Sequence, residues 1–176
     1  MITVFENFNN NVVKPPDLNS VSDEFWKMVD IADWNAVIKG YSENPIIDDE
    51  HRNFLNEAKF RVYNKYTFNQ VQEFHKEYQN IYYKIYEYFE LYFMDGEHGV
   101  SLGGDSYTDL MSSVIGKGKD FLTRCIEDYE LVTQMAKNND YAENFEYIFM
   151  VSEKEYIDIK VLFDPFFKAK RRYRFA

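Results

Sequence analysis

Residues 67–93 place their apolar side chains at alternating steps of three and four residues, which is the pattern of one face of an α-helix. The stripe consists of Val71, Phe74, Tyr78, Ile81, Ile85, Tyr88 and Tyr92. Thr67 and Gln70 precede it in the order of a capping box, in which two side chains satisfy backbone N–H groups at a helix start. We therefore expect a central helix from Thr67 to Phe93, with burial of Phe74, Tyr78, Ile81, Ile85 and Phe89. The tyrosines could instead form a docking platform, but helical spacing beside charged flanks favours a core role.

Before this helix, the sequence predicts an arm and two helices. Asn9-Asn10-Asn11 and Pro15-Pro16 interrupt regular structure, so residues 1–20 should form an irregular arm or a short edge strand. Ser22 is an N-cap residue followed by two acids, and the helix that it starts, or the continuation of that helix, should end at Gly40 or in the loop after it. Asp48-Asp49-Glu50 introduces a second helix, because acids are favourable at its positive end.

After the central helix, Ser106 and Asp109 repeat the capping-box order and predict a short helix through Ile115, which Gly116 and Gly118 end. Residues 121–137 should be helical with a break near Asp128. Residues 157–163 alternate in a manner closer to a strand than to a helix. The predicted fold is therefore mainly α: a compact single-domain helical bundle with room for a short strand near the C-terminus.

The chain has 176 residues, 45% of them hydrophobic and 19% aromatic, which is enough for one packed core. We divide it into the arm at residues 1–20, a helical domain at residues 21–164 and a basic C-terminal tail at residues 165–176. The net charge is −10, but removing the tail's five basic residues leaves 15 basic against 30 acidic residues, or −15. Those five residues are Lys168, Lys170, Arg171, Arg172 and Arg174.

An acidic body repels nucleic acid phosphates, so we expect no nucleic acid to bind it directly. The charge serves either solubility or the attraction of a basic protein partner. The tail could bind nucleic acid or anionic lipid, with Phe166, Phe167 and Tyr173 inserting, or it could fold back onto the acidic body. We expect no membrane span, because no uninterrupted apolar run approaches the required length, and we expect a cytoplasmic protein.

The sequence shows no recognisable catalytic or metal-binding pattern. Cys125 is the sole cysteine and fits a small core residue. His51, His75 and His98 lie in different segments and form no zinc pattern. Asp48-Asp49-Glu50-His51 lacks the spacing of a calcium loop. We therefore expect no catalytic residue, no metal and no cofactor.

Two segments carry a resemblance to a known family. Phe25-Trp26-Lys27-Met28-Val29-Asp30 lies near the start, and Gly104-Asp105-Ser106-Tyr107-Thr108-Asp109-Leu110 with Ser113-Val114-Ile115-Gly116-Lys117-Gly118-Lys119-Asp120-Phe121 lies far downstream. Over about residues 20–135, their order and spacing resemble the bacterial domain of unknown function 4240. This chain departs from the family at Thr108-Asp109-Leu110, where the family has Asp-Asp-x-Phe, at Ser113, where it has Trp, and after Asp128, where no Pro follows.

The resemblance implies a helical fold and no established activity. The positions that correspond to the family's turn and helix end are Gly104, Asp105, Asp109, Ile115 and Gly118. Caps and turns alone would also require these residue types.

Two classes of function remain open. The first is a protein–protein interaction module, most concretely an immunity or inhibitor protein of a bacterial toxin or defence system that blocks a basic partner through its acidic surface. The partner-binding candidates are Asp48, Asp49, Glu50, Asp105 and Asp109. The alternative is a small enzyme or ligand-binding domain with its site near Asp105 and Asp109.

Overall fold

The predicted central helix forms as α4, Phe68–Met94, in a computed structural model that describes residues 14–43, 49–94, 102–142 and 144–163. The capping box before it is present: the Thr67 N–H donates to Gln70 Oε1 at 2.9 Å, and the Gln70 N–H donates to Thr67 Oγ1 at 3.4 Å. The five residues of this helix that were expected to be buried are at most 5% exposed: Phe74, Tyr78, Ile81, Ile85 and Phe89. This part of the sequence prediction is confirmed.

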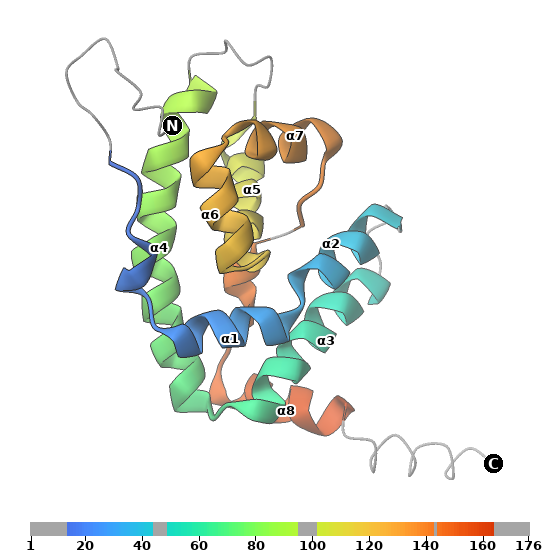
Figure 1. Cartoon of the computed structure of the whole chain (residues 1–176). Coiled ribbons are helices and arrows are strands. Elements are labelled where there is room, and N and C mark those ends of the chain that lie inside the picture. The colour runs from blue at the N-terminus through green and yellow to red at the C-terminus, as the bar shows by residue number, and fades with distance from the viewer. Residues whose placement is uncertain (1–13, 44–48, 95–101, 143, 164–176) are drawn as a thin grey trace.

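The described residues form helices throughout, and none of them is assigned to a strand. In chain order the elements are the 3-10 helix η1 (Leu18–Ser20), α1 (Asp23–Ala32), α2 (Trp34–Glu43), α3 (Asp49–Lys65), α4, α5 (Gly104–Gly116), α6 (Lys119–Glu127), α7 (Glu130–Asn138), the 3-10 helix η2 (Phe145–Ile148) and α8 (Glu153–Phe163). Figure 1 shows α4 along one side of the molecule, α5 beside it, α6 and α7 next to α5, and α8 near the lower end of α3. The mainly α prediction is confirmed.

Ser22 caps α1 as expected, since its Oγ accepts from the Phe25 N–H at 3.1 Å. The helix ends at Ala32, because Asp33 adopts the left-handed conformation (φ 50°) and separates α1 from α2, and its continuation α2 ends at Glu43, in the predicted loop. Gly40 is not a helix stop. It lies inside α2, where an added Cβ would meet the Phe54 ring at 2.5 Å, so glycine allows α2 to approach α3 closely.

The predicted start of α5 was wrong. Gly103 is the N-cap, so Ser106 and Asp109 lie within the helix and do not cap it. The helix still ends at Gly116, and Gly118 precedes α6 with a φ of 95°. The predicted break near Asp128 is confirmed, because α6 ends at Glu127 and α7 begins at Glu130.

The predicted C-terminal strand was also wrong, because residues 157–163 belong to helix α8. A capping box starts this helix: the Ser152 N–H donates to Glu155 Oε2 at 2.9 Å, and the Glu155 N–H donates to Ser152 Oγ at 3.2 Å. Tyr156 and Ile159 are buried at a helical spacing of three residues. The apparent alternation arose because apolar residues also occupy the exposed side, so they no longer mark one face.

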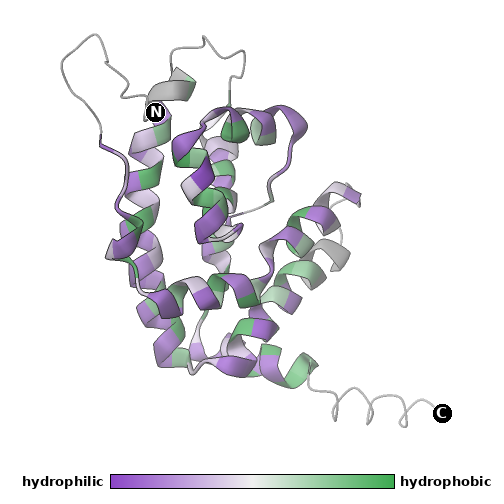
Figure 2. Cartoon of the chain, viewed as in Figure 1, coloured by the Kyte–Doolittle hydropathy of each residue, from purple (hydrophilic) through white to green (hydrophobic). Residues whose placement is uncertain are grey.

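One hydrophobic core joins all eight of the described α-helices and η2. Figure 2 shows hydrophobic and hydrophilic residues interleaved along the helices, as amphipathic packing requires. None of the described helices has both the length and the apolar content needed to cross a bilayer.

Candidate functional site

Four of the five acidic candidates fall on two separate elements. Asp48 lies outside the described residues, and Asp49 and Glu50 open α3. Asp105 is exposed in the first turn of α5, and Asp109 lies one turn later and is half-buried. Figure 1 shows the start of α3 well away from the start of α5.

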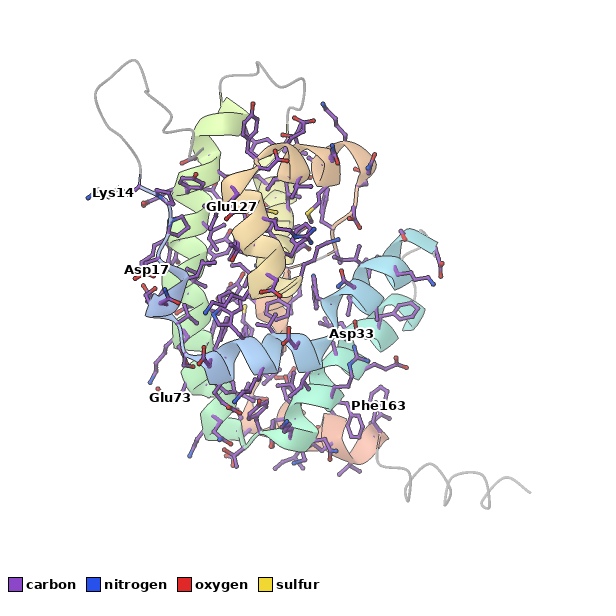
Figure 3. The ribbon with its side chains drawn as sticks, in the orientation of Figure 1. Lys14, Asp17, Asp33, Glu73, Glu127 and Phe163 are labelled. Atoms are coloured by element: carbon purple, nitrogen blue, oxygen red, sulfur yellow. The ribbon has the colours of Figure 1, made fainter. Side chains whose placement is uncertain are left out.

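Negative charge is spread over the molecule. The acidic side chains labelled in Figure 3, Asp17, Asp33, Glu73 and Glu127, come from four different parts of the chain and are exposed. A partner would therefore meet an acidic background on several sides. A specific contact needs a feature beyond charge alone, and the junction of α4, α5 and η2 has one.

The deepest part of this junction is a hydrogen-bond network around Ser112. Ser112 Oγ donates to Asn144 Oδ1 at 2.6 Å, accepts from the Phe145 N–H at 2.7 Å and lies 2.8 Å from the Tyr78 hydroxyl oxygen. Burial raises the pKa of Tyr78 well above its ordinary value, and the negative charges of Glu146 and Asp109 contribute to that rise. The network joins α4 and α5 to the segment that leads into η2. Its buried serine is held by structural hydrogen bonds.

Ser113 makes a second structural link on the same helix. Trp34 Nε1 donates to its Oγ at 3.2 Å, and the Ala142 N–H donates to the same oxygen at 3.1 Å. One turn later, a Cβ on Gly116 would lie 2.7 Å from the Trp34 ring. The residue types at 113 and 116 are therefore explained by close packing of α2 on α5.

Nearer the surface, His75 and Gln79 of α4 meet Glu146 of η2. His75 Nε2 lies 2.6 Å from Glu146 Oε1, and Gln79 Nε2 donates to the same oxygen at 3.1 Å. The His75 ring stacks on Phe149, with centroids 5.7 Å apart and planes 13° apart. Both members of the His–Glu pair keep 21% of their side chains exposed, so a partner can reach this pair.

A row of tyrosines continues from this pair along α4. The ring centroids of Tyr78 and Tyr82 are 5.5 Å apart, and those of Tyr82 and Tyr86 are 5.9 Å apart. Tyr83 contacts Tyr82 edge-on and is 63% exposed. Burial raises the pKa of Tyr82; nearby groups including Glu146 raise it further, and a hydrogen bond with Thr108 of α5 lowers it.

These contacts define one surface, which we call the tyrosine–carboxylate face. It consists of His75, Gln79, Tyr82, Tyr83, Asp109 and Glu146. Tyr rings with carboxylates beside them attract cationic side chains, because the ring face and the carboxylate are both negative. Of the predicted acidic residues, Asp109 belongs to this face.

Cys125 and the histidines do not form a reactive centre among the described residues. Cys125 is fully buried, and burial raises the pKa of its thiol to about 12. No group of three potential ligands among histidine, cysteine, aspartate and glutamate gathers in the described part of the chain. The core interpretation of Cys125 is confirmed by its burial.

Sequence reasoning missed His75, Gln79 and Glu146. Seventy-one residues separate His75 from Glu146, so no local motif relates them. A partial signal was present in the steps of four, three and four from His75 through Gln79 and Tyr82 to Tyr86, which place these residues on one side of α4.

No family model matches the chain, and comparison with curated proteins and with solved structures also found no match.

Proposed function

We propose that this chain is a protein–protein interaction module that blocks a basic partner, in the manner of an immunity or inhibitor protein of a bacterial toxin or defence system. The tyrosine–carboxylate face is the proposed contact surface. One observation carries the proposal: an exposed tyrosine, Tyr83, lies one helical turn after Gln79, which donates to the carboxylate of Glu146, and the described ion-pair partner of Glu146 is a histidine rather than a lysine or arginine. The proposed compartment remains the cytoplasm.

The tyrosine–carboxylate face would favour binding in two ways, one acting at long range and one on contact. The net charge of −15 before the tail steers a cationic partner over long range and raises its association rate. On contact, an arginine or lysine of the partner packs on the Tyr82 and Tyr83 rings and pairs with Glu146. Each cation–π contact at an exposed site contributes about 0.5–1 kcal/mol.

The test begins with the full chain as bait in its native host, with a crosslinker to retain fast-dissociating partners. Two charge-matched variants are compared: Glu146→Gln on the face, and Glu73→Gln, which is exposed on α4 and pairs with Lys76. Both variants lose one negative charge and keep the side-chain shape. We expect Glu146→Gln to recover less partner than Glu73→Gln, and Tyr83→Ala to weaken binding roughly fivefold or more, the scale of an interface anchor.

Stopped-flow mixing with the recovered partner then separates the effect of long-range electrostatic attraction on the association rate from the effect of the contacts formed in the complex. We expect the association rate to fall as salt rises, because screening removes long-range attraction first. An equal loss of partner binding in Glu146→Gln and Glu73→Gln would show that binding depends only on the total charge. That result would contradict the tyrosine–carboxylate face as the contact surface. Recovery of no protein would contradict the interaction function itself.

The enzyme alternative near Asp105 and Asp109 gains one specific observation. His75 and Glu146 have the short contact and the partial exposure that acid–base chemistry needs, and they adjoin Asp109 through the Tyr78 network. Turnover of a small molecule by the full chain, lost in His75→Gln and retained in Glu73→Gln, would support this alternative instead.

A further inference from the structure

The two carboxylate oxygens of Glu146 have different surroundings. His75 Nε2 lies 2.6 Å from Oε1, and Gln79 Nε2 donates to the same oxygen at 3.1 Å. Among the hydrogen bonds of the described residues, none reaches Oε2. In the described part of the chain, the only fully buried side-chain nitrogen or oxygen without a hydrogen-bond partner is Trp26 Nε1, so Glu146 Oε2 is open to solvent. The carboxylate therefore keeps one oxygen that can accept a hydrogen bond from a partner.

The same carboxylate fixes the orientation of the two side chains beside it. An ionised carboxylate only accepts hydrogen bonds, so His75 turns an Nε2–H towards it and Gln79 turns its amide nitrogen towards it. The carbonyl oxygen of Gln79, Oε1, lies at the other end of that amide and takes part in none of the described hydrogen bonds. It is open to solvent for the same reason as Glu146 Oε2. Thus η2 and α4 each present one open acceptor oxygen beside the hydrogen bond that joins them.

Two open acceptors on a partly buried surface favour a guanidinium over an ammonium. A guanidinium carries five N–H groups in a planar fork, so one N–H can donate to Glu146 Oε2 while another donates to Gln79 Oε1. It is also more weakly hydrated than an ammonium, which lowers the cost of bringing it to a carboxylate side chain that is only 21% exposed. Tyr83 is 63% exposed and lies one turn after Gln79, so its ring offers a surface on which the guanidinium plane can stack.

We infer that the tyrosine–carboxylate face selects arginine over lysine in its partner, and that Gln79 is the residue that determines this preference. The guanidinium donates to Glu146 Oε2 and Gln79 Oε1 together and stacks on Tyr83. A lysine ammonium is a compact, strongly hydrated charge, so it gains its attraction from Glu146 and little from the amide beside it. This inference rests on the proposed function, because it names the group of the partner that the same surface accepts.

Two short peptides that differ in one residue test the arginine preference. The first is acetyl-Gly-Ser-Arg-Ser-Gly-amide, and the second has lysine in place of arginine. Each carries one positive charge, so the long-range attraction to the acidic chain is the same for both. Each peptide is titrated into the full ¹⁵N-labelled chain, and its dissociation constant is obtained from the backbone amide signals of Gln79, Tyr83 and Glu146. We expect the arginine peptide to bind roughly threefold more tightly or better, the scale of one added hydrogen bond. Equal affinities would overturn the preference.

Gln79→Met tests the role of the amide, because methionine has a similar length and no carbonyl oxygen. The arginine peptide should lose its advantage in this variant, while the affinity for the lysine peptide stays within about twofold. Gln72→Met is the matched control: Gln72 also lies on α4 and donates to the Phe149 carbonyl next to η2 at 3.2 Å, but it makes no described bond to Glu146. The control should keep the arginine preference. A preference that persists in Gln79→Met, or that is lost equally in Gln72→Met, would overturn the role of Gln79.

Glu146→Gln separates the arginine preference from the contact surface itself. If both peptides bind the natural chain equally and both bind Glu146→Gln more weakly, the face remains the contact surface and only the selection of arginine fails. Failure of either peptide to bind the natural chain would overturn the arginine preference directly. The proposed function is decided separately, by the recovery of a protein partner from the native host.

Discussion

Gly118 joins α5 to α6 in a conformation that side chains disfavour. Its φ is 95° and its ψ is 169°, a region essentially reserved for glycine, and a Cβ here would lie 3.2 Å from an Asp30 carboxylate oxygen. We expect Gly118→Ala to lower the free energy of unfolding by about 1–3 kcal/mol. Urea denaturation followed by circular dichroism measures this change.

Gly103 provides a matched control for this substitution. It also precedes a helix, but its φ is −66° and a Cβ there meets no atom within 4 Å. Gly103→Ala should therefore cost less, about 0.5–1 kcal/mol, which is the preference for glycine over alanine at an N-cap without any backbone strain. If the two substitutions cost the same, the backbone conformation at Gly118 is not the constraint that we infer.

The buried thiol of Cys125 makes the stability of the folded chain depend on pH. Burial raises the pKa of its thiol from an ordinary 9.0 to about 12, with Arg124 and Lys117 opposing part of the rise. Because the folded pKa is the higher one, the protonated thiol's contribution to stability is complete below about pH 9 and is lost as the pH rises towards 12. We expect the natural chain to have a higher free energy of unfolding than Cys125→Ala, and this difference should become smaller between pH 8.5 and about 10.5. Unfolding in urea at several pH values tests this, and a constant difference would contradict the assigned cause.

At the scale of single elements, the stability of α8 depends on the capping box in its first turn. Ser152 and Glu155 satisfy each other's backbone N–H groups, so Ser152→Ala should cost about 1 kcal/mol of stability. Ser42→Ala is the control, because Ser42 is exposed near the end of α2 and its hydroxyl donates only to the Lys39 carbonyl at 2.9 Å among the bonds described. Amide exchange in α8 should quicken in the first variant alone. Unchanged exchange there would show that tertiary packing, not the cap, holds the helix.

The sequence predicted α4 well and α8 poorly for one physical reason. In α4 the apolar residues follow one face, so their spacing reports the helical period directly. In α8 the exposed Ile157 and Val161 add apolar residues to the other side and imitate alternation. At α5 the Ser106 and Asp109 pattern was present but unused, because Gly103 begins the helix one turn earlier.

The candidate site was less predictable than the fold, because its contacts are distant in sequence. Glu146 reaches His75 from η2, and Asn144 reaches Ser112 from the segment before it. Neither pair has a local spacing that would reveal it. Asp109 was identified as a candidate from the acidic surface and the family resemblance, and the separate prediction that it helps to cap the start of a helix was wrong.

At the scale of the whole molecule, the helices share polar as well as apolar contacts. Trp34 of α2 donates to Ser113 of α5, Tyr63 of α3 donates to the Ile148 carbonyl of η2 at 2.6 Å, and Tyr156 of α8 donates to the Tyr63 carbonyl of α3 at 3.2 Å. Each of these bonds is buried and joins segments more than 75 residues apart. Losing one helix would leave polar groups unpaired in another, which costs about 1–3 kcal/mol for each group.

We therefore expect the helical domain to unfold as one cooperative unit. The two tryptophans, Trp26 and Trp34, lie in α1 and α2, so their fluorescence reports the N-terminal helices, whereas far-ultraviolet circular dichroism reports all of them. The two urea transitions should have the same midpoint and slope, because the core is continuous across the elements. A fluorescence transition at lower urea would show that α1 and α2 open first, and it would mean that the bond from Trp34 to Ser113 does not couple them to α5.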